Sequence, residues 1–383
     1  ERHVGKREAV ELRRAALEKL TGAKLDAVGK YSIDPDNVIG KSIENMIGAV
    51  QVPLGFAGPL AIRGDHANGE FYVPLATTEG ALVASVNRGC RAITESGGCQ
   101  VKILDSKQTR APAFRFKGVR DAAAFVEWVA KHFAEIKKQA EVSQDHLKLQ
   151  AIRPIVLGNH VFLRFEADTG DAMGMNMITI ASQQACEWIS QQTGADFVTV
   201  TGNVCNDKKP CSLNHILGRG KTVAADVIVP EKVLKDVLKT TPEKFVQLVT
   251  SKVYLGGIAS QSIGFNGHAA NIFKAIFTAT GQDEAHIVEG SLATTMAEQR
   301  GKDFYMCVHV PCIQVGTVGG GTRVETSRDC LRMMGCEGGG TPPGKNALKF
   351  AEIVAASVLA GELSALAALA EHQLTGAHAK MGR

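Results

Sequence analysis

The segment Gly202-Asn203-Val204-Cys205-Asn206-Asp207-Lys208-Lys209-Pro210 separates two parts of the chain whose sequence patterns differ. Its Gly, Asn and Pro residues argue against a regular helix or strand and indicate a connecting loop. An exposed lysine usually lies on a helix face with partners three or four residues away. Here Lys208 and Lys209 follow Asp207 in a loop, where an ammonium group can reach a developing negative charge. A solvated pair of surface lysines is the alternative interpretation.

The part of the chain before this segment, residues 112–200, has the pattern of a small α+β unit. We expect strands near 112–118, 147–155, 160–168 and 196–201, and helices near 121–140 and 173–193. Two helices packed on one face of a small antiparallel sheet would fit that order.

The flanking parts are dominated by helical patterns and glycine turns. We expect a charged helix that ends at Thr21-Gly22, turns with short strands over 34–64, a strand at 71–75, a helix from Thr77 to Glu95, and helices near 230–239, 242–254, 268–279 and 345–374. A chain of 383 residues is long for one core. We therefore divide it into an N-terminal helical segment (1–47), a large domain (48–111 with 212–383), the small domain (112–200) and a connecting loop (201–211).

The composition is that of a soluble globular protein, with 45% hydrophobic and 21% charged residues. A formal net charge of +4 gives no indication of a nucleic-acid or membrane partner. The longest apolar run, 353–370, is interrupted by Gly361 and Glu362, which favours a buried helix over a membrane span. A membrane anchor upstream of this sequence stays open. The nine cysteines form no CxxC pair and no zinc spacing, so we expect reduced thiols and no metal site.

Four further residues each allow two interpretations. Glu79, in Thr77-Thr78-Glu79-Gly80, fits either a capping carboxylate or a buried acid of adjustable pKa. Asp171 precedes a Met-rich helix, which fits either a core helix or a site for a nucleotide diphosphate. Asp283 follows a helix, where it opposes the helix dipole and needs a cationic partner. His378 lies in a C-terminal tail, where a lone histidine usually has no function.

Together these segments resemble the 3-hydroxy-3-methylglutaryl-coenzyme A (HMG-CoA) reductase family, in a form closer to its class I than to its class II. The matching pieces run in the family's order from about residue 38 to the end of the chain. They are Glu44 to Gly48, Pro74 to Gly80, Asn87 to Ile93, Asp171 to Ile178, Asp207 to Pro210, His268 to Asn271, Gly281 to Asp283, Gly316 to Thr322, Ala360 to Ser364, and His378.

The resemblance implies a four-electron reduction of HMG-CoA to mevalonate and CoA through a hemithioacetal and an aldehyde. The catalytic residues would be Glu79, Lys208, Asp283 and His378. Lys208 would stabilise the oxyanion that hydride attack creates, and Glu79 would exchange the matching proton. Asp283 would bridge Glu79 and Lys208, and His378 would protonate the departing CoA thiolate.

Binding residues follow from the matching positions. For HMG-CoA they are Arg110, Thr201, Asp207, Lys209, Lys252, Asn271, Ser85, Asn87 and Arg88; for the nicotinamide dinucleotide they are Asp145, Asp171, Met173, Gly174, Met175 and Asn176. Asp145 lies where animal members carry an arginine for the 2′-phosphate of NADPH, so its charge favours NADH. Membership of class I favours NADPH. We expect NADPH, with NADH as the alternative.

The resemblance also implies an α+β fold, with a large domain around a long central helix and an inserted ferredoxin-like small domain. It implies a cytoplasmic homodimer or dimer of dimers with shared active sites, which binds HMG-CoA and mevalonate. Mevalonate oxidation, the same chemistry reversed, stays open as the physiological direction. The sequence also allows a non-catalytic relative that binds CoA or a nucleotide, and an acyl-CoA transferase that uses Glu79 as a base. The presence of all four catalytic residues argues against the non-catalytic relative.

Overall fold

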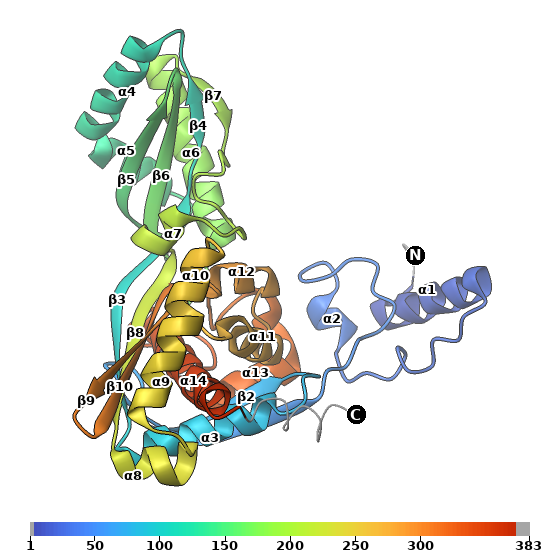
Figure 1. The fold of residues 1–383 in the computed structure, drawn as a ribbon. Helices are drawn as coiled ribbons and strands as arrows, with labels where there is room; N and C mark the ends of the chain where they lie inside the picture. The colour runs from blue at the N-terminus through green and yellow to red at the C-terminus, as the bar shows by residue number, and fades with distance from the viewer. Residues whose placement is uncertain (1–3, 373–383) are drawn as a thin grey trace.

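The structure, a computed structural model, describes residues 4–372, which are arranged around a ten-stranded sheet (Figure 1). Its main path runs β7-β4-β6-β3-β8-β10-β9; β5 pairs with β6, and β1 pairs with β2 and β3. The strands are β1 (Leu54–Arg63), β2 (Asn68–Ala76), β3 (Cys99–Arg110), β4 (Ala113–Arg115), β5 (Lys148–Leu157), β6 (His160–Asp168), β7 (Asp196–Thr199), β8 (Gly220–Val229), β9 (Thr294–Arg300) and β10 (Asp303–Ile313). Mixed helix and antiparallel sheet is therefore the fold class, as predicted; the short contact between β1 and β3 is parallel.

Helices cover the sheet and form the N-terminal arm that stands apart in Figure 1. They are α1 (Lys6–Thr21), α2 (Pro35–Val38), α3 (Leu82–Glu95), α4 (Val119–Lys131), α5 (Phe133–Glu141), α6 (Met175–Thr193), α7 (Ser212–Leu217), α8 (Glu231–Val233), α9 (Pro242–Leu248), α10 (Gly256–Ala259), α11 (Ala269–Thr280), α12 (Ile287–Gly290), α13 (Glu325–Met333) and α14 (Lys345–Ala370). Short irregular helices are η1 (Leu234–Leu238), η2 (Val249–Leu255), η3 (Glu284–His286) and η4 (Gly320–Arg323).

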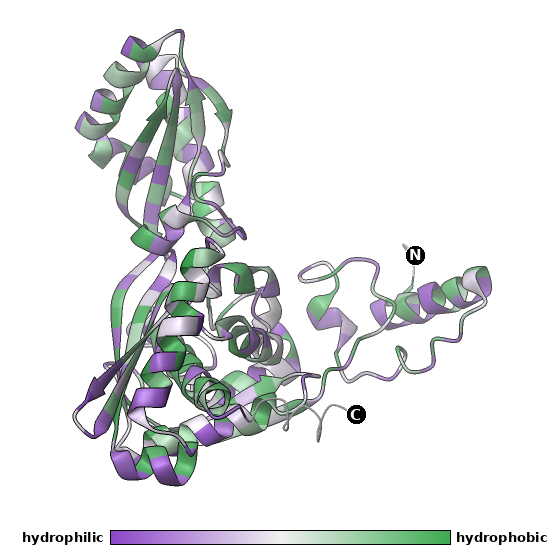
Figure 2. Cartoon of the chain, viewed as in Figure 1, coloured by the Kyte–Doolittle hydropathy of each residue, from purple (hydrophilic) through white to green (hydrophobic). Residues whose placement is uncertain are grey.

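The upper part of Figure 1 contains β4 to β7 with helices α4, α5 and α6. Its strands pair in the order β7-β4-β6-β5, all antiparallel. Helix α5 packs against α6, and a hydrophobic core drawn from residues 114–195 lies between the helices and the sheet. Surface helices such as α4 and α1 show hydrophilic and hydrophobic residues side by side in Figure 2, as one solvated face requires.

The long helix α14 forms the centre of the lower part, where it packs against α3, α11, β8 and β10. It is apolar on all sides, which is the pattern of a helix buried in a core. Among residues 4–372 it alone is long and apolar enough to cross a membrane, yet 83% of its most apolar window is buried inside the protein. The predicted buried helix is therefore confirmed.

Helices α3 and α14 cross at backbone contact because Gly89 has no side chain. A Cβ atom at Gly89 would collide with the carbonyl group of Ala360. The crossing brings Ser85 and Arg88 of α3 next to Ser364 of α14.

Several sequence expectations differ from the structure. The sequence did not predict strand β3, and it did not predict β8, β9 and β10, because residues 223–382 were expected to form helices and turns. The expected helix over 121–140 breaks at His132 into α4 and α5. The helix expected to begin at Thr77 begins instead at Leu82, because Ala81 adopts a left-handed conformation (φ 69°) that ends the preceding loop.

Candidate active site

The loop 202–210 connects β7 to α7 at the junction of the upper and lower parts (Figure 1). Asn203, Asn206 and Lys208 have left-handed backbone angles, with φ of 64°, 49° and 60°. Asparagine tolerates this conformation, but for lysine it is uncommon. The backbone N–H of Lys208 donates to Glu289 Oε1 at 2.6 Å, and this bond fixes the unusual turn. The loop therefore presents Lys208 in one defined direction.

Lys208 forms an ion pair with Asp283, with 2.6 Å between Nζ and Oδ2. The two side chains are 41% and 37% exposed, so a ligand can reach them. Burial alone would raise the pKa of Asp283, but the hydrogen bond from Lys208 and the nearby His286 lower the pKa below its ordinary value. Lys208 is thus the cationic partner that the position of Asp283 after α11 requires.

Glu79 lies in the loop before α3, and Asn271 Nδ2 donates to its Oε1 at 3.1 Å. A groove of about 680 Å³, lined by residues of 53–56 and 77–87, contains Glu79 and Asn87. Among residues 4–372, Asp283 makes no hydrogen bond or ion pair with Glu79, so the expected bridge between Glu79 and Lys208 is not formed in this structure.

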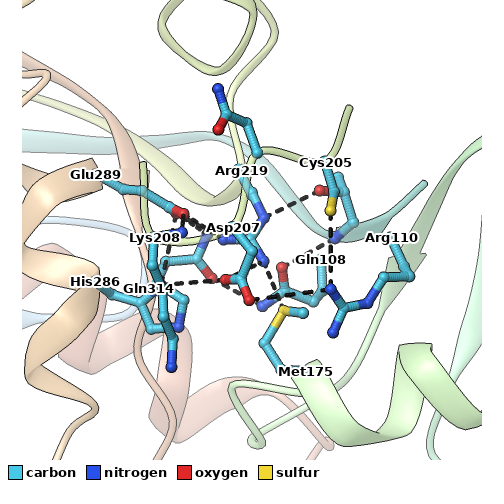
Figure 3. A network of polar contacts seen from close by, with 12 residues as sticks. Gln108, Arg110, Met175, Cys205, Asp207, Lys208, Arg219, His286, Glu289 and Gln314 are labelled. Atoms are coloured by element: carbon cyan, nitrogen blue, oxygen red, sulfur yellow. Dashed lines mark hydrogen bonds and ion pairs between the residues drawn. The ribbon is translucent and has the colours of Figure 1, made fainter. Parts of the chain in front are cut away.

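A buried cluster of Arg219, His286 and Glu289 lies next to Asp207 and Lys208 (Figure 3). Arg219 is fully buried, and its Nη1 lies 2.6 and 2.7 Å from the two carboxylate oxygens of Glu289. Its Nη2 lies 3.0 Å from Asp207 Oδ1. Burial alone would raise the pKa of Glu289, but the neighbouring His286 and Arg219 lower it. The cluster holds the connecting loop against α12.

Arg110, at the end of β3, faces the same loop. Its guanidinium donates to Thr179 Oγ1 at 2.9 and 2.7 Å and to Thr201 Oγ1 at 3.4 Å. One of its nitrogens lies 4.0 Å from Asp207 Oδ2. Arg110, Thr201 and Asp207, which were predicted to bind substrate, are therefore neighbours.

Three of the residues predicted to bind HMG-CoA lie on α3, namely Ser85, Asn87 and Arg88. Arg88 donates to the hydroxyl and carbonyl oxygens of Ser364 at 3.0 and 2.6 Å, and Ser85 lies 3.0 Å from the same hydroxyl. Asn87 accepts the backbone N–H of Gly58 at 2.9 Å. Burial lowers the pKa of Arg88. Ser85 and Arg88 are thus fixed to α14, while Asn87 lines the groove beside Glu79.

The predicted dinucleotide segment begins with Asp171, which is buried. Its carboxylate accepts backbone N–H groups of Gly340 and Gly344 at 2.8 Å and of Ala347 at 3.0 Å, and so caps α14. The sequence placed Asp171 at the start of α6, but its hydrogen bonds go to a distant helix. Its neighbour Met173 accepts from Gln108 through its carbonyl oxygen at 2.7 Å.

The rest of that segment is divided between the core and the surface. Gly174 caps α6 with φ of 91°, and Met175 is buried with its sulfur against Arg219. Asn176 is exposed on the first turn of α6, and Asp145 is exposed in the turn between α5 and β5. Asn176 and Asp145 are therefore the two exposed members of the predicted set.

Two of the described predicted residues, Lys209 and Lys252, lie apart from these contacts. Lys209 is exposed, and its Nζ donates to the backbone carbonyl of Asp207 at 3.0 Å. Lys252 is exposed on η2 and makes no side-chain hydrogen bond or ion pair within residues 4–372. His378 lies outside the described residues.

The sequence interpretation missed Arg219, His286 and Glu289. A signal was present, because His286 and Glu289 are three residues apart in a helical stretch that directly follows Asp283, and this spacing puts them on one face. Arg219 stands between Gly218 and Gly220, and nothing in this local sequence indicates that its side chain is buried.

The fold and this arrangement define a two-part α+β protein with a polar, ligand-accessible centre where the parts meet, as in an enzyme active site. The chain belongs to the hydroxymethylglutaryl-coenzyme A reductase family, whose model matches residues 9–383.

Relatives named 3-hydroxy-3-methylglutaryl-coenzyme A reductase support this assignment. The protein of Pyrococcus abyssi is 53% identical over 99% of this chain and 93% of its own length. That of Methanothermobacter thermautotrophicus is 50% identical over 100% and 96%, and that of Zea mays 42% identical over 98% and 66%. The NADPH-bound class II reductase structure from Streptococcus pneumoniae has a TM-score of 0.66 at 18% identity, covers 96% of this chain and 97% of its own, and shows a shared fold.

Proposed function

We propose that this protein reduces HMG-CoA to mevalonate and CoA in two hydride transfers. The observation that carries the proposal is the accessible Lys208–Asp283 pair, 2.6 Å long, in a chain about half identical to named reductases over nearly its whole length. Both steps of such a reduction place negative charge on a carbonyl oxygen, and an ammonium group held in one direction stabilises that charge.

Each side chain has a task that its position supports. Lys208 donates a hydrogen bond to the thioester oxygen and then to the aldehyde oxygen, while Asp283 keeps the ammonium oriented. Glu79, held by Asn271, exchanges the proton of the hydroxyl that forms. Arg110 and Lys209 carry the charge to bind the substrate carboxylate. His378 is proposed to protonate the CoA thiolate, on sequence grounds alone.

NADPH is the proposed cofactor, and when bound it would supply the two hydrides. The exposed Asn176 and the backbone of 173–175 at the start of α6 fit a dinucleotide, since a helix N-terminus favours phosphate. The NADPH-bound relative supports this choice. Asp145 is exposed and acidic, which opposes a 2′-phosphate. Comparing kcat/KM for NADPH and NADH in the wild type and in Asp145→Asn tests the choice; a strong preference of the wild type for NADH would overturn it.

The class I assignment is supported by identities of 42 to 53% with plant and archaeal reductases against 18% with the class II structure. The small domain is proposed to be ferredoxin-like, because its βαββαβ order and strand order β7-β4-β6-β5 are those of that fold. The division at 1–47, 48–111 with 212–383, 112–200 and 201–211 is supported by two separate cores. One is drawn from residues 114–195 and the other from residues 57–101 and 223–367.

A cytoplasmic homodimer, or dimer of dimers, with shared active sites is the proposed assembly. Its support is the N-terminal arm, which stands away from the lower part and exposes Leu20 and Val50 (81% and 89% exposed). Light scattering would give the subunit number. Mixed oligomers of Lys208→Ala and Glu79→Gln subunits would regain activity only if the two residues act from different subunits.

The function is tested by oxidation of NADPH with HMG-CoA as the acceptor and by identifying mevalonate as the product. Lys208→Ala should lower kcat by at least about a hundredfold while CoA binding persists. Lys235→Ala is the matched control, because Lys235 forms an equally short ion pair, 2.6 Å from Glu231, on a remote surface.

Retained binding without turnover in the wild type would favour the non-catalytic relative. Acyl transfer without NADPH oxidation would favour the transferase. Wild-type activity in Lys208→Ala would remove the proposed role of that lysine.

A further inference from the structure

The fully buried histidine His286 has no assigned role, and its surroundings are unusual. Neither ring nitrogen has a hydrogen-bond partner among residues 4–372. Nδ1 lies 3.8 Å from Asp207 Oδ1 and 3.7 Å from Glu289 Oε2, and Nε2 lies 3.7 Å from Asp283 Oδ2. Both edges of the ring therefore face carboxylates, and Figure 3 labels the two beside Nδ1, Asp207 and Glu289.

A neutral imidazole does not suit this position. It has one N–H and one bare lone pair, so one edge would direct a lone pair at a carboxylate in a site without solvent. An imidazolium has two N–H groups and can donate at both edges. Buried polar groups normally have hydrogen-bond partners. The unpaired ring nitrogens therefore indicate a doubly protonated ring, whose N–H groups would bond the carboxylates if the 3.7 to 3.8 Å distances shortened slightly.

Three carboxylates surround the ring. Asp207 and Glu289 lie beside Nδ1, and Asp283 lies beside Nε2. The cations of the cluster pair with these carboxylates: Arg219 with Asp207 and Glu289, Arg110 with Asp207, and Lys208 with Asp283. Each edge of the ring therefore meets at least one carboxylate oxygen, which favours an N–H group at both edges. A divalent cation between Asp207, His286 and Glu289 would lie beside the guanidinium of Arg219.

We propose that His286 is a positively charged positioning residue that makes Lys208 an effective oxyanion donor. This inference rests on the proposed reduction. Lys208 paired to Asp283 at 2.6 Å presents little net positive charge, because the carboxylate cancels it. His286 shares the same oxygen of Asp283 from the buried side. The carboxylate is then divided between two cations, and Lys208 keeps positive potential toward the substrate oxygen.

The first test separates binding from chemistry with His286→Gln, which keeps one N–H donor and removes the charge. We expect kcat to fall roughly tenfold to a hundredfold, which corresponds to the loss of one hydrogen bond to a charged group. KM for HMG-CoA should change by less than about threefold. His309→Gln on β10, a half-buried histidine outside the cluster, is the control and should match the wild type.

The second test needs no variant. Neutron diffraction from deuterated wild-type crystals at neutral pH should show deuterium on both His286 nitrogens. A singly deuterated ring, a wild-type kcat in His286→Gln, or a metal ion bound between Asp207, His286 and Glu289 would each overturn the proposal. If the wild type does not reduce HMG-CoA, the proposed function fails, and the neutron result still reports the charge of the ring.

Discussion

Asn271 donates a hydrogen bond to Glu79 and thereby joins the start of α11 to the loop before α3. The position of Asn271 is set from the interior, because buried Glu362 of α14 accepts the backbone N–H groups of Gly267 and His268, each at 2.6 Å. Glu362 also accepts from the Thr295 hydroxyl at 2.7 Å. An exposed carboxylate of the site is thus oriented by a chain of contacts that ends in the core.

Glu79→Gln tests the proton-exchange role. The amide can still accept from Asn271 but cannot release a proton, so kcat should fall roughly 10²–10⁴-fold with CoA binding unchanged. Steady-state kinetics and calorimetric CoA titration measure the two quantities. Glu70→Gln, at an exposed position on β2, should behave as the wild type. Equal kcat in Glu79→Gln and the wild type would mean that another group exchanges the proton.

The free energy of unfolding should decrease at acid pH because the buried carboxylate of Glu362 becomes protonated. Burial alone would raise the pKa of Glu362, but hydrogen bonds from His268, Gly267 and Thr295 lower it below the ordinary 4.5. A carboxyl group whose folded-state pKa is lowered stabilises the protein above its unfolded-state pKa, and this contribution disappears as the pH falls through the folded-state value. The loss therefore begins below about pH 4.5.

Urea unfolding as a function of pH measures this effect. Glu362→Gln should lose about 1–3 kcal/mol at pH 7 and show a weaker dependence below pH 4.5. Some dependence should remain, because the pKa of Glu289 is also lowered. An unchanged pH dependence would show that Glu362 does not drive the acid response.

Gly89→Ala should separate helices α3 and α14. The added methyl group meets the Ala360 backbone, so we expect a loss of about 1–3 kcal/mol in the free energy of unfolding. Affinity for CoA should fall as well, because Arg88 and Ser364 lose their contact. Gly118→Ala, where nothing lies within 4 Å of the new atom, should stay within about 0.5 kcal/mol of the wild type. Similar stability for both variants would contradict the close crossing.

Asp171→Ala separates a structural role from a cofactor role. Three backbone N–H groups lose their acceptor, which should cost about 1–3 kcal/mol of stability. Asn176→Ala, at an exposed position, should leave stability unchanged and raise KM for NADPH. If Asp171→Ala changed KM for NADPH without changing the melting temperature, its carboxylate would serve the cofactor and not the helix.

Most helices and strands within 112–200 could be predicted from sequence because they follow local rules. The strands and helices there alternate, and Gly158 and Gly194 mark the turns with left-handed angles. Strands β8 and β10 could not be predicted in the same way, since both faces are largely buried and the residues show no clear alternation of polar and apolar types. Burial on both faces depends on the helices that pack there, which no local pattern encodes.

The site residues also differ in whether local sequence or only the tertiary fold reveals their contacts. A cationic partner for Asp283 could be predicted from sequence, because Asp283 follows a helix and a carboxylate is unfavourable at a helix C-terminus. Asp171 was assigned to the adjacent helix α6, whereas it caps α14, a partner that only the tertiary fold brings near. Arg219 and Glu289 look like ordinary surface charges in the sequence, and only their burial shows that they form a pair.

The capping of α14 by Asp171 connects this long helix to the segment that precedes α6. The helix spans 26 residues, about 39 Å at 1.5 Å per residue, and ends at Ala370, eight positions before His378 in the sequence. Asp171 joins the 171–176 segment to the N-terminal end of this helix through three backbone N–H groups. The proposed cofactor segment and the central helix of the core are therefore tied together at one carboxylate.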